Sequence, residues 1–221
     1  MKKLQIKNNK LLLIFGFVFL ISCKKPNEAS QEGLPFINSP EFTPEWISKD
    51  DPKYSTIHTI PPFSFTNQDG EIVNEKTVEN KIYVADFIFT SCGSICPKMT
   101  DNFKILQTKF INDPELLLLS HSVTPEIDNV KTLKEYASLK GCVSGKWHLL
   151  TGDKKAIYEI AKKQYFAGDS IGYFGKIDDF LHTENVLLID KKRRIRGVYN
   201  GTLAVEMDRI IEDIATLKEE K

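Results

Sequence analysis

Apolar and polar positions along this chain repeat with two distinct periods, which predict strands and helices in turn. Short continuous apolar runs rich in β-branched and aromatic residues are typical of buried strands, whereas apolar residues at every third or fourth position predict amphipathic helices. The expected strands are 63–65, 72–73, 81–90, 116–123, 147–150, 185–189 and 195–199, and the expected helices are 97–110, 126–139, 153–161 and 205–217. Because strands alternate with helices before a final hairpin and helix, the pattern predicts an α/β sandwich.

The start of the chain follows a different pattern. A basic opening, MKKLQIKNNK, precedes the apolar run LLLIFGFVFLIS, which is short for a membrane span and typical of a secretory signal. Residues 20–23, LISC, resemble the bacterial lipoprotein box, in which the signal is cut before a cysteine that then carries a lipid. We therefore expect a lipoprotein-type signal peptide over 1–22 and lipidation of Cys23. The alternative is an uncleaved N-terminal anchor, which also holds the domain at a membrane, on the side away from the cytoplasm.

Composition and charge limit the possible organisation and partners of the rest of the chain. Residues 23–50 mix Pro, Ser, Asn, Glu and Lys with isolated apolar residues, which predicts a flexible tether. The stretch 51–221 has the length of one ordinary domain. Lys and Arg number 30, as do Asp and Glu, so the net charge is zero and indicates no nucleic-acid partner. The basic run 191–194 lies between two apolar stretches and is expected to be a solvated hairpin turn.

Two of the four cysteines, Cys92 and Cys96, lie where the first long strand meets a helix. Along a helix this spacing puts the two Cα atoms about 6 Å apart on one face, near the upper limit for a disulfide. A helix N-terminus stabilises thiolates, and two thiolates can chelate a soft ion such as Cu(I) or zinc. The pattern alone leaves a structural disulfide, a redox pair and a metal site open. Cys142 is the odd thiol and is expected to be inert.

A metal site needs a further ligand, and the four histidines are the candidates. His121, inside an apolar strand, is expected to be a hydrogen-bonded core residue, His148 to be structural and His58 to lie at the surface. His182 ends an irregular stretch directly before an apolar strand, which is a common location for a functional residue. Asp86 interrupts the central strand, either as a carboxyl that moves protons near the thiols or as a hydrogen-bonded structural residue.

Four blocks along the chain resemble the Sco/SenC proteins, thioredoxin-fold copper-binding proteins that assist assembly of cytochrome c oxidase. Residues 92–97, CGSICP, are similar to the family's Cys-Pro-x-x-Cys-Pro motif, and residues 122–128, SVTPEID, to its Ser-Val-Asp-Pro-x-x-Asp block. Residues 147–152, WHLLTG, resemble its Trp-x-x-Leu-Thr-Gly block, and the stretch 182–190 resembles its ligand histidine with the following strand. The resemblance spans about residues 60–217, which is nearly the whole domain.

The resemblance implies a thioredoxin-like fold, a central mixed sheet flanked by helices, and a copper site made by Cys92, Cys96 and His182 for Cu(I) or Cu(II). It also implies a partner, the copper-accepting subunit of cytochrome c oxidase or another copper protein. The implied location is the bacterial cell envelope, as a membrane-anchored lipoprotein facing the periplasm. Two departures leave the copper affinity and the redox potential open: Gly93 replaces the usual proline, and Thr124 replaces a frequent acid.

Two functions are compatible with these residues. A metallochaperone would hold copper by Cys92, Cys96 and His182 and pass it to a partner's thiols without any turnover. A thiol–disulfide reductase would keep the partner's cysteines reduced, with one thiolate attacking and the other resolving the mixed disulfide. Only the first function requires His182. A thiol peroxidase on the same fold is disfavoured, because it would need an activated cysteine and the sequence shows no Arg near the cysteine pair. We expect copper handling, with thiol exchange as the alternative.

Overall fold

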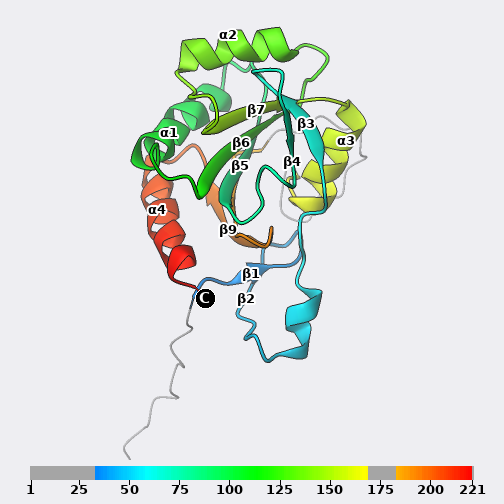
Figure 1. Cartoon of the computed structure of the whole chain (residues 1–221), viewed down its shortest axis with the longest axis vertical. Coiled ribbons are helices and arrows are strands. Elements are labelled where there is room, and N and C mark those ends of the chain that lie inside the picture. The colour runs from blue at the N-terminus through cyan, green and yellow to red at the C-terminus, as the bar shows by residue number, and fades with distance from the viewer. Residues whose placement is uncertain (1–32, 169–182, 221) are drawn as a thin grey trace, which may run out of the picture. The chain divides into compact units, whose positions relative to one another are not determined.

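The computed structural model describes residues 33–168 and 183–220, which fold around a mixed β-sheet (Figure 1). The strands are β1 (Phe36–Ile37), β2 (Pro44–Glu45), β3 (Ser64–Asn67), β4 (Ile72–Asn74), β5 (Ile82–Ile88), β6 (Leu116–Ser122), β7 (Trp147–Thr151), β8 (Asn185–Ile189) and β9 (Ile195–Asn200). The helices are η1 (Pro52–Thr56), α1 (Ile95–Lys109), α2 (Val130–Lys140), α3 (Lys154–Glu159), η2 (Ile160–Gln164) and α4 (Ala204–Glu219). The expected α/β architecture, with a central mixed sheet between helices, is confirmed.

The main sheet has the strand order β4-β3-β7-β6-β5-β8-β9. Strands β5, β6 and β7 run parallel to one another, and every other pairing is antiparallel. In the register Asp86 pairs with Ser120 of β6, and Ala85 pairs with Leu187 of β8. Because β8 runs against β5, the end of β5 and the start of β8 meet at one edge of the sheet. The loops that follow β5 and β6 leave from this same edge.

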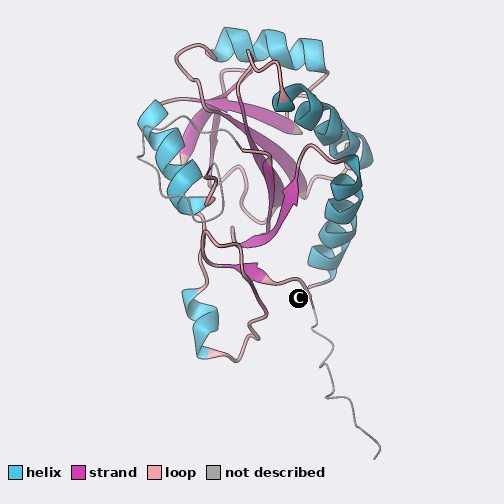
Figure 2. Ribbon diagram, turned by 180° about the vertical axis from the view of Figure 1, so that it is seen from behind, coloured by secondary structure: helices cyan, strands magenta, loops and turns pink. Residues whose placement is uncertain are grey.

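The central strand β5 is buried on both faces because successive side chains of a strand point to opposite sides. Val84 and Ile88 belong to a core shared with α1, α2 and α4, whereas Tyr83 and Phe87 belong to a second core that includes α3. Figure 2 shows α1 and α4 along one side of the sheet and α3 on the other. Within the described ranges, none of the helices combines the length and the apolar character that crossing a membrane requires.

Helix boundaries follow local capping. The Asp153 carboxylate accepts a hydrogen bond from the Ala156 N–H at 2.8 Å, so the expected cap of α3 is confirmed. The helix expected over 126–139 begins only at Val130, with Asn129 as its N-cap. The later start has a physical reason, because the Asp128 side chain bonds to residues outside the helix and holds 124–128 in turns.

The segment 33–50 differs from the tether expected over 23–50. Phe36 and Ile37 in β1 are only 5% and 4% exposed, and Ile37 joins the core on the α3 side of the sheet. The isolated apolar residues of this stretch therefore do have a core to enter, which composition alone does not reveal. From residue 33 onward the chain is part of the folded domain.

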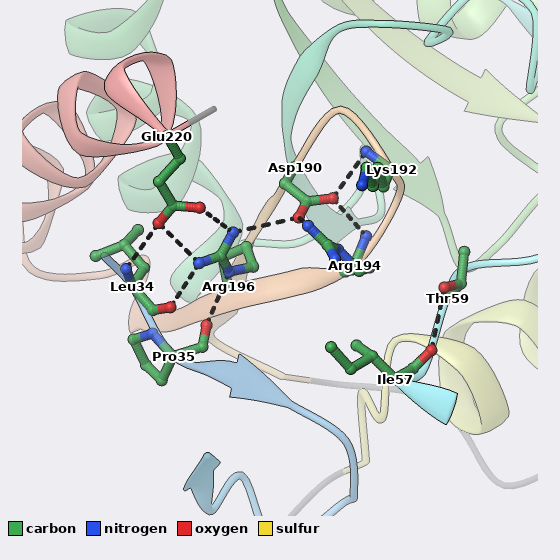
Figure 3. Close-up of polar contacts among 9 residues, drawn as sticks. All are labelled: Leu34, Pro35, Ile57, Thr59, Asp190, Lys192, Arg194, Arg196 and Glu220. Carbon is green, nitrogen blue, oxygen red and sulfur yellow. Dashed lines mark hydrogen bonds and ion pairs between the residues drawn. The ribbon is translucent and has the colours of Figure 1, made fainter. Parts of the chain in front are cut away.

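Arg196 fixes this N-terminal segment to the end of α4 (Figure 3). Its guanidinium group donates to the carbonyl oxygens of Leu34 and Pro35 at 2.5 and 2.9 Å, and it pairs with both carboxylate oxygens of Glu220 at 2.7 and 2.8 Å. The Leu34 N–H donates to Glu220 at 2.9 Å. Such bidentate, charge-assisted bonds are stronger than neutral ones, so one buried side chain ties three distant parts of the chain together.

The β8–β9 turn carries the basic run 191–194. Lys191 and Lys192 are exposed, as expected for a solvated hairpin turn. Arg194 departs from that expectation because it is only 9% exposed and its guanidinium group lies 2.7 Å from the Asp190 carboxylate (Figure 3). The run therefore begins as an exposed turn at Lys191 and Lys192 and ends in an arginine that forms an internal ion pair with Asp190.

Candidate metal centre

The thiol pair lies at the edge of the sheet where β5 passes into α1. Cys92 stands in the turn after β5, and its N–H donates to the Phe89 carbonyl at 3.1 Å. Cys96 lies in the first turn of α1, which begins at Ile95. The strand-to-helix location is as expected. The helical spacing considered for the pair does not apply, because Cys92 precedes the helix. The Cys96 N–H still points at Cys92 Sγ, with a nitrogen-to-sulfur distance of 3.5 Å.

The two thiols differ strongly in acidity. Both are free, and they are 8% and 2% exposed. Burial by itself raises the pKa of Cys92, but hydrogen bonds from the Cys96 thiol and from the N–H groups of Ser94, Ile95 and Cys96 outweigh it and lower this pKa. Burial, followed by the hydrogen bond with Cys92, raises the pKa of Cys96 to about 12. Cys92 is therefore the thiol that ionises, and Cys96 keeps its proton.

We expect Cys92 to be alkylated at least about tenfold faster than Cys96 or Cys142 at pH 7, because the thiolate is the nucleophile. Cys142 is more exposed, but burial raises its pKa to about 12. Timed reaction of the reduced protein with iodoacetamide, followed by peptide mass spectrometry, reports each cysteine separately. Exposure alone predicts that Cys142 reacts before Cys92, whereas acidity predicts the reverse. Faster modification of Cys142 would therefore contradict the assignment of Cys92 as the thiol that ionises.

Asp86 lies in the middle of β5 with its side chain fully buried. Neither carboxyl oxygen has a hydrogen-bond partner among the described residues, so the structure does not bear out a hydrogen-bonded structural aspartate. Burial raises the pKa of Asp86 to about 7, and the Ser120 hydroxyl in the neighbouring strand offsets part of that rise although it is not within hydrogen-bonding geometry of either carboxyl oxygen. Its charge adds to the raised pKa of Cys96. A carboxyl group that titrates near neutral pH thus lies within electrostatic range of the thiols.

The candidate histidines are not gathered at the thiols within the described part of the chain. His182 itself lies outside it. His58 is half-buried, with its ring 2.8 Å from a backbone carbonyl, and the buried His148 bonds to an asparagine amide at 3.1 Å. His121 is fully buried and neither ring nitrogen has a partner there, so the expected hydrogen bonding of this residue is wrong. In residues 33–168 and 183–220 no group of three His, Cys, Asp or Glu side chains can hold a metal ion.

One feature of the site was missed in the sequence. The Asp128 carboxylate accepts hydrogen bonds from Thr90, which lies two residues before Cys92. The signal was available, because Asp128 ends the block 122–128 that resembles a family motif. Sequence spacing could not show which loop this carboxylate reaches.

Comparisons with known proteins place the chain in a family. The SCO1/SenC family model matches residues 52–219. The SCO1 protein homolog of Bacillus subtilis (strain 168) is 33% identical over 166 residues, which are 73% of this chain and 85% of that protein. The family-model match covers β3 to β9, α4 and the loop 89–94 that carries Cys92, called the thiol loop below.

Solved structures agree with this assignment. A SCO1/SenC family lipoprotein from Bacillus anthracis str. Ames is 30% identical with a TM-score of 0.64, over 73% of this chain and 96% of that one. ScoI of Arabidopsis thaliana, solved with copper bound, is 25% identical with a TM-score of 0.56, over 70% and 97% of the two chains. These likenesses confirm the thioredoxin-like fold, and copper is the metal with which Sco proteins have been solved. The Sco family is a family of cytochrome c oxidase assembly proteins. On its sequence, its fold and its thiol site, the chain belongs to the SCO1/SenC family.

Proposed function

We propose that this protein is a copper metallochaperone that assists maturation of the copper centre of cytochrome c oxidase, with Cys92, Cys96 and His182 as the copper ligands. The free thiol pair at the start of α1, with the lowered pKa of Cys92, carries the proposal. The thiolate is the form that binds metal, so Cys92 offers a ligand that is readily ionised. Cys96 must give up its proton when the ion binds, which makes copper uptake release protons and depend on pH.

The donor set suits copper as cargo. Two thiolate sulfurs favour Cu(I), and one imidazole extends the site to Cu(II). The Cys92 side chain is the less buried of the two thiols, so a partner's thiol can approach it first. Transfer then proceeds by ligand exchange: one bond from sulfur to copper forms on the partner as one breaks on this protein. No redox change or turnover is required.

The topology supports His182 as the third ligand. The chain re-enters the described structure at Thr183, which is only 4% exposed, and β8 begins two residues later. Since Leu187 of β8 pairs with Ala85 of β5, the start of β8 lies beside the end of β5, where the thiol loop begins. His182 directly precedes this point in the sequence. Thr183, the described neighbour of His182 in the sequence, therefore lies at the same end of the sheet as the thiol loop.

We further propose that the domain is held in the bacterial cell envelope by a lipid on Cys23 and faces the periplasm. Cys23 lies outside the described residues, and the sequence LISC at 20–23 motivates the assignment. The similar protein from Bacillus anthracis is a lipoprotein. The partner is then a copper-accepting protein at the same membrane, such as the copper-accepting subunit of the oxidase.

Thiol–disulfide exchange is the second candidate, and the unequal acidity of the two cysteines favours it. The Cys92 thiolate would attack a partner disulfide, forming a mixed disulfide and releasing one partner thiolate. Cys96 would then attack Cys92 Sγ, releasing the second partner thiolate and closing a Cys92–Cys96 disulfide. The partner gains two electrons and this protein loses them, so a further reductant must restore the dithiol.

Anaerobic titration of the reduced protein with Cu(I) against a competing chelator separates the two candidates. We expect one tightly bound copper, weakened in Cys92→Ser, Cys96→Ser and His182→Ala by more than the roughly 10–100-fold that loss of an outer partner costs. Cys142→Ser and His58→Ala are matched controls, since each removes the same type of donor at a place away from the thiol pair, and both are expected to bind copper as the unmodified protein does.

Copper binding that is equally tight in His182→Ala and in the unmodified protein would overturn the three-ligand site. A different result, in which the unmodified protein itself fails to compete with the chelator for Cu(I), would overturn the metallochaperone function and leave thiol exchange.

A further inference from the structure

A fully buried carboxylate lies between β6 and α2, beside the thiol loop. Asp128 is 0% exposed and accepts four hydrogen bonds. Its Oδ2 accepts from the Thr90 N–H at 3.1 Å, from Ser122 Oγ at 2.6 Å and from Thr124 Oγ1 at 3.0 Å, and its Oδ1 accepts from Thr90 Oγ1 at 2.5 Å. Oδ2 accepts three of these bonds and Oδ1 accepts one, so donors from the chain itself satisfy both carboxylate oxygens.

The four bonds join two loops that are distant in the sequence. Ser122 and Thr124 belong to the same segment as Asp128, whereas Thr90 belongs to the turn between β5 and α1. The Val123 N–H also donates to the Ile88 carbonyl at 2.9 Å, just before that turn. The thiol loop is therefore attached at Thr90, by its backbone and by its side chain, to a point outside itself.

The attached turn is the one that carries Cys92. Thr90 lies two residues before Cys92, whose own N–H closes the turn on the Phe89 carbonyl. On the far side of the turn, Cys92 Sγ accepts from the Cys96 N–H at 3.5 Å. The sulfur is thus held between the start of a helix and a loop whose other end is fixed at Asp128.

We propose that Asp128 is a positioning residue for Cys92: by holding Thr90 it keeps Cys92 Sγ against the N–H groups of the first turn of α1. This role rests on the proposed function, in which Cys92 is a working thiol, and it deepens that function by naming what sets the thiol's reactivity. Because those N–H groups stabilise the thiolate, they stabilise the reduced pair over the disulfide. Release of Thr90 therefore favours the disulfide and lowers the reduction potential.

Thr124 is consistent with this arrangement. It stands where related sequences often carry an acid, and its hydroxyl donates to Asp128. A second carboxylate at this position would face Asp128 as a like charge instead of donating to it. In this chain residue 124 thus adds one hydrogen bond to Asp128 from within the same segment.

The test is the reduction potential of the copper-free Cys92–Cys96 pair, measured in glutathione buffers. Protein dithiol and one glutathione disulfide yield protein disulfide and two glutathione thiols, so atoms and electrons balance. We expect Asp128→Ala to raise the equilibrium constant for disulfide formation about tenfold, which corresponds to a potential lower by about 30 mV. Thr90→Val, which loses the hydroxyl bond alone, is expected to shift it in the same direction by less, and Thr90→Ser to restore the original value.

Thr124→Val is the matched control, since it also removes one hydroxyl bond to Asp128 but leaves the thiol loop attached. Thermal unfolding of each variant accompanies the potentials. A Thr90→Val potential equal to that of the unmodified protein, or a Thr124→Val shift as large as that of Thr90→Val, would overturn the positioning role. The reduction potentials are measured without copper, so the two proposals fail separately. If copper binding fails, only the proposed function is overturned. If copper binding is intact but the potentials do not change, only the positioning role of Asp128 is overturned.

Discussion

Replacing Asp86 with asparagine is expected to stabilise the reduced, metal-free protein by up to about 4 kcal/mol at pH 8, and by little at pH 4. The substitution keeps the shape of the side chain and removes a charge that burial makes costly. Asp86 is fully buried in the middle of β5, and neither of its oxygens has a partner among the described residues. An unpaired carboxylate in such a place opposes folding whenever it is ionised.

The direction of this pH dependence follows from the pKa values of Asp86 in the unfolded chain and in the folded protein. Burial raises the pKa of Asp86 from 3.8 to about 7 in the folded protein. Below pH 3.8 both states carry the proton and nothing is lost. Between these values the unfolded chain releases the proton while the folded protein keeps it, so stability falls as pH rises. Above pH 7 the full difference applies, which at 1.36 kcal/mol per pKa unit is about 4 kcal/mol.

Urea unfolding at pH 4 and pH 8 measures this effect directly. Asp208→Asn is the matched control, because Asp208 is an exposed carboxylate on α4 and surface substitutions usually change stability by less than about 0.5 kcal/mol. A gain at pH 8 that is no larger than the gain at pH 4 would show that Asp86 is not charged and unpaired in the folded protein.

The parts of the fold that sequence predicted are those that local pattern determines. The runs that became β5 and β6 are apolar throughout because both faces of a central parallel pair are covered. The face of α1 formed by Met99, Phe103 and Leu106 is likewise buried as its spacing requires. In each case the residues that decide the structure lie within a few positions of one another.

The predictions that the structure corrected depend mainly on contacts between segments that are distant in the sequence. The start of α2 moved because Asp128 bonds to Thr90, 38 residues away. The segment 33–50 is folded because Arg196, more than 160 residues along the chain, reaches its backbone. The spacing of about 6 Å considered for two cysteines along a helix does not apply, because α1 begins three residues after Cys92. Of the candidate site, sequence therefore predicted the residue types and the edge of the sheet, whereas the acidity of each thiol required the three-dimensional structure.

His121 illustrates the same limit, because sequence predicted its burial but not its surroundings. The ring packs among Phe65, Phe87 and Tyr165, with ring centroids 5.5 Å away in each case, and neither nitrogen has a hydrogen-bond partner in the described structure. Burial lowers the pKa of His121 from 6.5 to about 3. A neutral imidazole is tolerated in this aromatic environment, and an imidazolium is not.

Replacing His121 with leucine is therefore expected to remove a large loss of stability in acid. In the unmodified protein the unfolded chain takes up a proton below pH 6.5 while the folded protein does not, so this residue lowers stability as pH falls. By pH 3 the contribution of His121 to this loss reaches about 4 kcal/mol. Urea unfolding from pH 3 to pH 7 measures it, and a His121→Leu protein that loses stability in acid as steeply as the unmodified one would contradict this assignment.

The two buried groups act in opposite directions over the same range. Between about pH 4 and pH 6.5, Asp86 makes stability fall with rising pH and His121 makes it rise, each by about 1.4 kcal/mol per pH unit. Their contributions cancel in the unmodified protein, so each single variant should reveal the slope of the other group. Asp86→Asn is expected to gain stability as pH rises across this range, and His121→Leu to lose it. The double variant should regain the slope of the unmodified protein, since every other titrating group is common to all four proteins.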